Sequence, residues 1–248
     1  MGRLQDKVAL VTGAGQGFGL GIAECFAREG AKLALVDIQA DKAAAVATGL
    51  PGSLALAADV SSAGDVNATV EQTVARFGRI DIVVNNAGIS HRNRPMLEVD
   101  EAEFDRIFAV NVKSIYLYAQ AAIPHMRRQG GGVILNIGST AGIRPRPGLA
   151  WYNASKGAVN LLSKSMAVEL APDRIRVNAI APVAGETPLL ATFMGEDTPE
   201  KRAAFKASIP WGRLSTPNDI GNAAVFLCSD EAEMVTGDVL QVDGGRCI

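Results

Sequence analysis

The sequence predicts an α/β fold: a single doubly wound domain over residues 1–248, with a parallel sheet of about seven strands and helices on both faces. Short apolar runs rich in β-branched residues alternate with Ala-rich stretches of helical period. Most of these runs are apolar on both faces, as strands covered by helices on each side must be. No Pro/Gly/Ser-rich linker divides the chain, and the alternation implies parallel strands joined by right-handed crossovers.

The positions of these segments give the order of the elements. We expect strands at residues 7–13, 32–37, 53–59, 80–88, 132–139, 174–182 and 239–245. We expect helices around residues 17–29, 64–77, 101–128, 152–171 and 217–229. The segment 183–216 breaks this rhythm after the carboxyl end of a strand, where α/β folds bind ligands. It is expected to be a substrate lid, and an irregular surface insertion is the alternative.

Composition restricts the class of function. Hydrophobic residues make up 48% of the 248 residues and charged residues 20%, which suits a large core. The formal net charge of −2 gives no electrostatic basis for binding nucleic acid or a membrane surface. The chain enters a strand-like run at once and has no apolar run near the ~20 residues that span a bilayer, so we expect neither a signal peptide nor a membrane partner. Cys25, Cys228 and Cys247 lack any zinc or C-x-x-C spacing, so we expect no metal and a cytoplasmic location.

A glycine-rich turn, TGAGQGFG, follows the first expected strand. The spacing of Gly13, Gly17 and Gly19 allows a tight turn, a close approach of the backbone to a pyrophosphate, and close packing of the next helix. The free N–H groups and the positive dipole end of that helix would then meet the phosphates. A glycine pattern alone is common, but its place between a strand and a helix favours a dinucleotide site.

Asp37 ends the second expected strand, eighteen residues after Gly19. A carboxylate at this place accepts hydrogen bonds from the ribose hydroxyls of adenosine and repels a 2′-phosphate. An aspartate that merely caps the following helix is the alternative. Because no Lys or Arg stands at positions 14–18 or 38, the sequence predicts NAD(H) rather than NADP(H) as the cofactor.

Two further strand ends are expected at the same edge of the sheet. Asp59 and Val60 close the third strand and would lie at the adenine, and NNAG (residues 85–88) closes the fourth. Asn85 and Asn86 are alternatively plain turn residues.

Four polar residues are predicted to converge beside this dinucleotide loop. Tyr152 and Lys156 stand four residues apart and therefore share one helix face. Ser139 ends the strand before that helix, and Asn111 lies inside the preceding helix, where its side chain could hold a water or interrupt the backbone ladder. Each has an ordinary structural explanation alone, but chance convergence of all four is improbable.

With these motifs in order, the sequence resembles the short-chain dehydrogenase/reductase family, whose members have a Rossmann-type fold. The resemblance runs from about Leu4 to the C-terminus and rests on TGAGQGFG, NNAG, Asn111, Ser139, YNASK and VNAIAP. It implies Tyr152 as the general acid/base and Ser139 as the group that orients the substrate oxygen. It also implies that Lys156 binds the nicotinamide ribose and lowers the pKa of the tyrosine, while Asn111 holds a water of a proton relay.

The resemblance also implies which residues contact NAD. They are Gly13, Gln16, Gly17, Phe18, Gly19, Asp37, Ile38, Asp59, Val60, Asn86, Ala87, Gly88, Tyr152, Lys156, Pro182, Val183 and Thr187. One position departs from the family, which usually has Pro-Gly where this chain has Pro182-Val183. A β-branched residue lacks the backbone freedom of glycine, so the loop at 183–187 is expected to run differently.

Electrostatics supports the role implied for Tyr152. Free tyrosine has a pKa near 10, too high for a base at neutral pH. A positive charge at about 5 Å and an effective dielectric near 20 is worth roughly 3 kcal/mol, or about two pK units. The cationic NAD⁺ ring would add to this effect and bring the pKa of the tyrosine close to the working pH.

The predicted substrate residues lie on two loops and on the lid. His91, Arg92 and Arg94 follow NNAGIS, and Arg144 and Arg146 lead toward Tyr152. The arginines could clamp an anion, because the guanidinium suits carboxylates; a solvated basic rim or a subunit contact is the alternative. Apolar lid residues would hold an aromatic or acyl group: Leu189, Leu190, Phe193, Met194 and Trp211.

The sequence therefore predicts an NAD-dependent enzyme that interconverts a secondary alcohol and a ketone on a small molecule. A 3-oxoacyl-thioester reductase is the alternative enzyme, although Asp37 argues against the NADPH that biosynthetic reduction usually draws on. A non-catalytic NAD-binding sensor and an epimerase are less favoured. The resemblance also implies a homotetramer.

Overall fold

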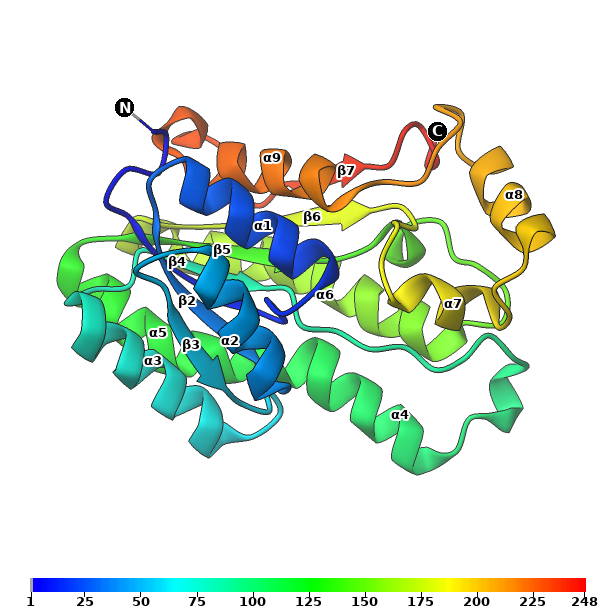
Figure 1. Cartoon of the computed structure of the whole chain (residues 1–248), viewed down its shortest axis with the longest axis horizontal. Helices are drawn as coiled ribbons and strands as arrows, with labels where there is room; N and C mark the ends of the chain where they lie inside the picture. Colours follow the sequence, from blue (N-terminus) through cyan, green and yellow to red (C-terminus); the bar gives the residue numbers. More distant parts are fainter. Residues whose placement is uncertain (1) are drawn as a thin grey trace.

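The computed structural model describes residues 2–248 and contains one parallel sheet of seven strands in the order β3-β2-β1-β4-β5-β6-β7 (Figure 1). The strands are β1 (Val8–Thr12), β2 (Lys32–Asp37), β3 (Leu54–Ala57), β4 (Ile82–Asn85), β5 (Gly132–Ile137), β6 (Ile175–Pro182) and β7 (Val239–Val242). All neighbouring pairs are parallel. The chain order reverses between β1 and β4, which is where such sheets open a ligand crevice.

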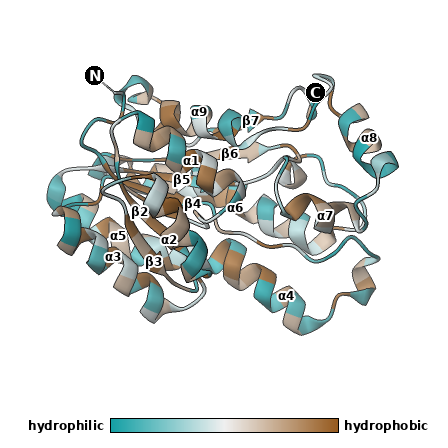
Figure 2. Cartoon of the chain, in the orientation of Figure 1, coloured by the Kyte–Doolittle hydropathy of each residue, from teal (hydrophilic) through white to brown (hydrophobic). Residues whose placement is uncertain are grey.

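Helices cover both faces of the sheet. They are α1 (Gly17–Arg28), α2 (Ala40–Gly49), α3 (Ala63–Phe77), α4 (Glu101–Phe108), α5 (Ser114–Gln129), α6 (Ala150–Leu170), α7 (Leu189–Met194), α8 (Pro199–Ala207) and α9 (Pro217–Cys228). One apolar core joins α1 and α9 to the sheet, and a second core joins α3, α5 and α6 to the opposite face. The strands are accordingly among the most apolar segments, as Figure 2 shows. The predicted doubly wound α/β class is confirmed.

The elements differ from the expected ones in three places. Helix α2 has no counterpart in the expectation, because its interior is mostly alanine and only Ala43 is fully buried, so it carries little apolar contrast. The helix expected at 101–128 is α4 and α5 joined by a π-helical turn, Ala109–Lys113. Strands β2 and β6 end where expected, but the other five end one to three residues earlier, so Asp59 and Ser139 each lie two residues beyond a strand.

The segment 183–216 contains two short helices, α7 and α8. Its ends are joined by a parallel bridge between Gly185 and Ser215. Val183, Leu190, Met194, Ile209 and Leu214 form a small apolar cluster of their own within it. The segment is therefore a folded element beside the sheet rather than an irregular loop.

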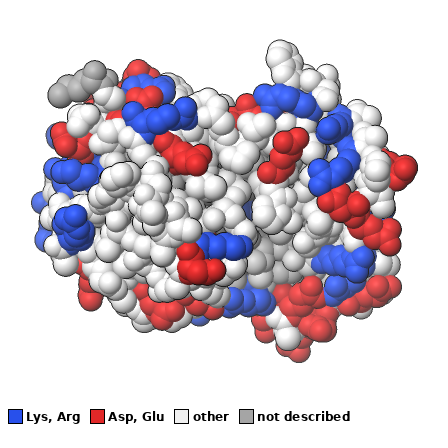
Figure 3. Space-filling view, viewed as in Figure 1, with Lys and Arg blue, Asp and Glu red and all other residues white. Residues whose placement is uncertain are grey.

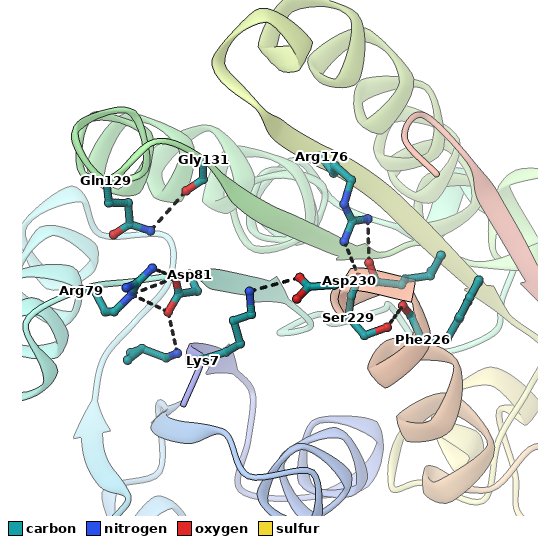
Figure 4. Close-up of polar contacts among 11 residues, drawn as sticks. Lys7, Arg79, Asp81, Gln129, Gly131, Arg176, Phe226, Ser229 and Asp230 are labelled. Atoms are coloured by element: carbon teal, nitrogen blue, oxygen red, sulfur yellow. Dashed lines mark hydrogen bonds and ion pairs between the residues drawn. The ribbon is translucent and has the colours of Figure 1, made fainter. Parts of the chain in front are cut away.

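A group of polar contacts lies at the amino-terminal edge of the sheet, opposite the carboxyl ends of the strands (Figure 4). Asp81 accepts a hydrogen bond from the Val8 amide at 2.8 Å and pairs with Arg79. Arg176 donates to the carbonyl oxygens of Ser229 at 3.0 Å and Leu227 at 2.8 Å. These contacts satisfy the first amide of β1 and carbonyl groups at the end of α9, so this edge is structural.

The visible surface carries charges of both signs. Figure 3 shows acidic side chains gathered where α4 lies and, elsewhere on that face, acidic and basic side chains interspersed. Within residues 2–248, no helix combines the length and apolar character needed to cross a bilayer. Cys25, Cys228 and Cys247 are free thiols.

Candidate active site

A cavity of about 410 Å³ opens at the carboxyl edge of the sheet. The residues that line it come from the ends of β1, β2, β4, β5 and β6, from the start of α6, and from the segment 183–216. This volume lies in the ordinary range for a small-molecule or cofactor site. The cavity therefore occupies the place that the fold class predicts.

The glycine-rich turn shapes one wall of the cavity. Gly13 and Gly17 have φ angles of 62° and 58°, which side chains rarely adopt. A Cβ on Gly13 would lie 2.9 Å from Asn86 Nδ2, and a Cβ on Gly19 would overlap the Gly13 carbonyl oxygen. Gly19 is buried and does not line the cavity; its role is to let α1 pack against the turn.

The amino-terminal end of α1 faces this cavity with unpaired donors. Its N-cap residue, Gln16, makes no capping hydrogen bond through its side chain, which instead accepts from Lys42 Nζ at 2.6 Å. Gln16, Gly17 and Phe18 all line the cavity. Backbone N–H groups at a helix start, with the positive end of the dipole, suit a phosphate. These residues fit the pyrophosphate of a dinucleotide.

Thr12 holds the turn after β4 in place. Its Oγ1 accepts from the amides of Asn86 at 2.9 Å and Ala87 at 3.0 Å, and it donates to Val84 O. Asn86 also donates to Thr12 O at 2.7 Å, while Asn85 points away from the cavity and donates to Asn136. Asn85 is thus the last residue of β4 and not a turn residue, whereas Asn86 both fixes the turn and lines the cavity with Ala87 and Gly88.

The carboxylate of Asp37 is 7% exposed and borders the cavity with Ile38. It accepts hydrogen bonds from the amides of Gly15 and Gln39, both at 2.9 Å. Neither bond caps α2, whose N-cap is Gln39 and has no side-chain capping bond, and free lone pairs of Asp37 remain for a ribose. Lys42 is a cation near this carboxylate, and its Cβ lies beside Gly15. Sequence reasoning missed it, because it is distant from the glycine-rich turn along the chain and lies on helix α2, which was not predicted.

Asp59 and Val60 line the cavity at the end of β3. Asp59 accepts from Ser61 Oγ at 2.7 Å and pairs with Arg106 at 3.0 Å. Burial acts against the ionised form, but these hydrogen bonds prevail and lower the pKa of Asp59. Arg106 also lines the cavity and was not anticipated, since nothing in the pattern of α4 distinguishes it from a solvated charge.

Tyr152 and Lys156 enter the cavity from the first two turns of α6. Both side chains are buried. Burial raises the pKa of Tyr152 to about 12, against a hydrogen bond from Ser139 that lowers it. Burial also lowers the pKa of Lys156 to about 8, and the ammonium donates to Ile137 O at 2.7 Å.

Ser139 faces the same cavity from the loop between β5 and α6. Its Oγ accepts from the Ala141 amide at 3.0 Å, and its carbonyl accepts from Asn160 Nδ2 at 3.2 Å. Asn160 holds the serine from behind and was not recognised in the sequence, where it is one more polar residue inside a helix. The structure thus brings Ser139, Tyr152 and Lys156 to one cavity.

Asn111 lies in the π-helical turn, as expected for a residue that interrupts a helix ladder. Its Nδ2 donates to Ile89 O and Ser155 Oγ, and its Oδ1 accepts from Ile89 N, all at 2.9 Å. The side chain does not line the cavity. A Cβ built on Gly88 would nevertheless lie 3.4 Å from both Asn111 Oδ1 and Lys156 Nζ, so both groups lie beside that glycine.

The loop that follows β6 contains the departure from the family at Val183. Within residues 2–248 the non-glycine residues with positive φ are Asp6 and Arg174, so Val183 has a backbone conformation open to any residue. Pro182, Val183 and Thr187 all line the cavity. The valine therefore places a buried apolar side chain against the cavity.

The predicted substrate residues separate into two groups. Arg146, Leu189 and Phe193 line the cavity. His91 is fully buried outside it, and Arg144 is exposed and donates to Arg246 O. Arg92 donates to Gly195 O, and Arg94 pairs with Glu103. Within residues 2–248, no group of three His, Cys, Asp or Glu side chains is arranged as a metal site.

Known proteins resemble this chain over its full length. The family model described as enoyl-(acyl carrier protein) reductase matches residues 13–246. The 4-formylbenzenesulfonate dehydrogenase of Comamonas testosteroni is 48% identical over 99% of both chains, and a 2-(S)-hydroxypropyl-CoM dehydrogenase of Xanthobacter autotrophicus is 40% identical over 98% of this chain and 97% of its own.

Two solved structures share the architecture. A crystal structure of 3-ketoacyl-(acyl-carrier-protein) reductase from Brucella melitensis in complex with NADH superposes with a TM-score of 0.94, at 51% identity over 99% of this chain and 100% of that one. A 7α-hydroxysteroid dehydrogenase in complex with NADH and 7-oxo glycochenodeoxycholic acid has a TM-score of 0.93, at 38% identity over 98% and 95%.

Proposed function

The chain belongs to the short-chain dehydrogenase/reductase family, and from this premise we propose that Tyr152, Ser139 and Lys156 catalyse the interconversion of a secondary alcohol and a ketone. The protein is an oxidoreductase that uses NAD(H). The observation that carries the proposal is the presence of these three buried side chains in one cavity with the glycine-rich turn.

We assign Tyr152 as the acid/base. Its pKa of about 12 reflects burial, so a base at neutral pH requires positive charge nearby. The Lys156 ammonium, anchored on Ile137 O, supplies part of that charge. Ser139 donates a hydrogen bond to the substrate oxygen, and NAD(H), when bound, accepts or supplies the hydride.

Asn111 is assigned to a proton relay. It holds the loop at Ile89 by two backbone hydrogen bonds and, like Lys156 Nζ, lies beside Gly88. A water at this junction would pass a proton from Lys156 to solvent after Tyr152 has changed its protonation state.

The preference for NAD over NADP is assigned to Asp37. Its buried carboxylate borders the cavity, where it would accept hydrogen bonds from the ribose hydroxyls and repel a 2′-phosphate. The NADH in two neighbouring structures agrees with this assignment. The remaining predicted cofactor residues that line the cavity form the rest of the proposed site.

The substrate is a small molecule, and the segment 183–216 is the proposed lid over it. Leu189 and Phe193 of this segment line the cavity. A 3-oxoacyl-thioester reductase is the second candidate, because one neighbouring structure carries that name. We also propose a homotetramer, supported by exposed apolar residues Tyr116, Leu161 and Val168 on α5 and α6, and a cytoplasmic location, supported by free cysteines.

A spectrophotometric screen of NAD⁺ reduction with secondary alcohols tests the proposal. We expect turnover with at least one alcohol and reduction of the matching ketone with NADH. An NAD-binding sensor would bind NADH without turnover, and a thioester reductase would act on acetoacetyl thioesters in preference to every simple ketone tested.

A further inference from the structure

One arginine in the cavity has no acidic partner. Arg146 follows the loop that carries Ser139, and its guanidinium stacks over Phe205 with 4.3 Å between the charged carbon and the ring centroid. Its Nη2 donates to Ser208 Oγ at 3.2 Å. Both contacts come from α8 and its end, within the proposed lid, so the guanidinium is held in position between that segment and the cavity.

Two other arginines of this region have acidic partners, while Arg92 and Arg144 donate to backbone carbonyl oxygens. Arg94 pairs with Glu103 and Arg202 with Asp197, whereas no ion pair of Arg146 is found within residues 2–248. Burial, followed by the positive charges of Arg246 and Arg144, lowers the pKa of Arg146 to about 10. Arg146 therefore remains charged at neutral pH, and a half-buried charge among like charges is stabilised by an anion.

A second arginine lies near Arg146 and has an unsatisfied donor. Arg246 Nε is buried and finds no hydrogen-bond partner among residues 2–248. Arg246, Arg146 and Phe205 together line a hollow that adjoins the main cavity. Sequence reasoning missed Arg246, because it lies a hundred residues from Arg146 along the chain. Arg146 thus borders both the cavity and the hollow, and Arg246 adds a second guanidinium group from the side of the hollow.

The stretch of cavity between Arg146 and Tyr152 is apolar. Phe193 packs against Tyr152 with 4.9 Å between ring centroids. Leu149 is buried in the same cluster, and Phe205 lines the cavity below the Arg146 guanidinium. A flat apolar body fits between such rings.

We propose that Arg146, assisted by Arg246, selects a substrate that has an apolar body of about one aromatic ring and a carboxylate or sulfonate at the end remote from the reacting carbon. This inference rests on the proposed dehydrogenase function, because it names the substrate class of the same cavity. The phosphates of an acyl-thioester carrier share the anionic chemistry, so the test includes them.

The experiment compares oxidation of 4-(1-hydroxyethyl)benzoate with that of 1-phenylethanol by NAD⁺. The wild type is expected to favour the anionic alcohol in kcat/KM. Arg146→Met is expected to reduce kcat/KM for the anionic alcohol by about 10- to 150-fold, as for loss of one charge-assisted contact, and to change that for the neutral alcohol by less than about threefold. Arg146→Lys should recover part of the loss, since it restores the charge without the planar fork.

The matched control is Arg128→Met, which removes one exposed positive charge from α5 outside the cavity. This variant should leave the ratio of kcat/KM for the anionic alcohol to kcat/KM for the neutral alcohol unchanged. Equal losses on both alcohols in Arg146→Met, or a changed molar mass by light scattering, would overturn the proposal in favour of a structural or subunit-contact role. An effect of Arg146→Met confined to acetoacetyl-CoA, and absent for the N-acetylcysteamine thioester, would overturn it in favour of a carrier phosphate.

A binding measurement separates this proposal from the proposed function. With NADH present, 4-acetylbenzoate should raise the Tm of the wild type more than acetophenone does, and Arg146→Met should abolish the difference. If neither alcohol turns over but this difference persists, the anion site stands and the dehydrogenase function is wrong. If the alcohols turn over and 4-acetylbenzoate has no Arg146-dependent effect, the anion site is wrong and the dehydrogenase stands.

Discussion

Cofactor preference offers a prediction that can be worked from the geometry of Asp37. Its carboxylate accepts from the amides of Gly15 and Gln39, so removal of the whole side chain would also disturb the turn. Asp37→Asn keeps an acceptor and the shape while it removes the charge. This substitution therefore isolates electrostatics from packing.

The expected magnitude has two parts. A hydrogen bond to a charged group is worth about 1.5–3 kcal/mol, so the Kd for NADH should rise about 10- to 150-fold. Asp37→Asn also removes a repulsion of about 2–3 kcal/mol against a 2′-phosphate after screening by salt. The preference for NADH over NADPH should therefore fall by at least about a hundredfold.

Lys42 sharpens the test. It lies beside Gly15 and is bound to Gln16, so it is a cation available to a 2′-phosphate once the charge of Asp37 is gone. The double variant Asp37→Asn, Lys42→Met should lose most of the gain in NADPH affinity. The assay is fluorescence titration of both reduced cofactors at fixed ionic strength. A preference for NADH that changes by less than about threefold in Asp37→Asn would refute the assignment.

Three further predictions concern the frame of the site. Gly19→Ala should abolish NADH binding, because its Cβ overlaps a carbonyl of the turn, whereas Gly49→Ala, which meets nothing within 4 Å, should leave titrations unchanged. Thr12→Val should lower the free energy of unfolding by about 2–4 kcal/mol, because two amides lose their acceptor; urea denaturation should show no comparable loss in Thr12→Ser. A hydrogen bond from Arg213 holds the pKa of Asp219 well below its ordinary value. The ionised Asp219 therefore contributes its full stabilisation to the folded state above about pH 4, and this stabilisation decreases as the pH falls. The stability difference between wild type and Asp219→Asn should therefore shrink between about pH 4 and pH 2, and a constant difference would contradict this account.

The sheet was predictable because its strands are apolar on both faces and each ends in a polar or glycine-rich turn. Helix α2 was not, since alanine fits a helix without marking a buried face. Strands β4 and β5 were predicted too long, because NNAG and the segment around Ser139 follow the apolar runs directly in the sequence. In the structure these segments are loops, held by side chains such as Thr12 and Asn160. Such contacts join residues distant in sequence, so no local pattern reveals them.

The same limit applies to the candidate site. Spacing alone brought Tyr152 and Lys156 onto one helix face, because that relation is local. Three charged residues near the site come from other elements and are brought there by tertiary packing: Lys42, Arg106 and Arg246. Too many arginines were predicted to contact the substrate. Arg94 and Arg144 lie close in sequence to residues that line the cavity, but in the structure they bind Glu103 and Arg246 O instead.

The central claim is that Tyr152 is the acid/base of an NAD-dependent dehydrogenase, and Tyr152→Phe tests it most directly. The variant keeps the ring that packs against Phe193 and removes only the hydroxyl. The account predicts that kcat falls by at least about 100-fold, while the Kd for NADH changes by less than about threefold. A variant that retained more than about a tenth of the wild-type kcat, with NADH binding intact, would contradict it.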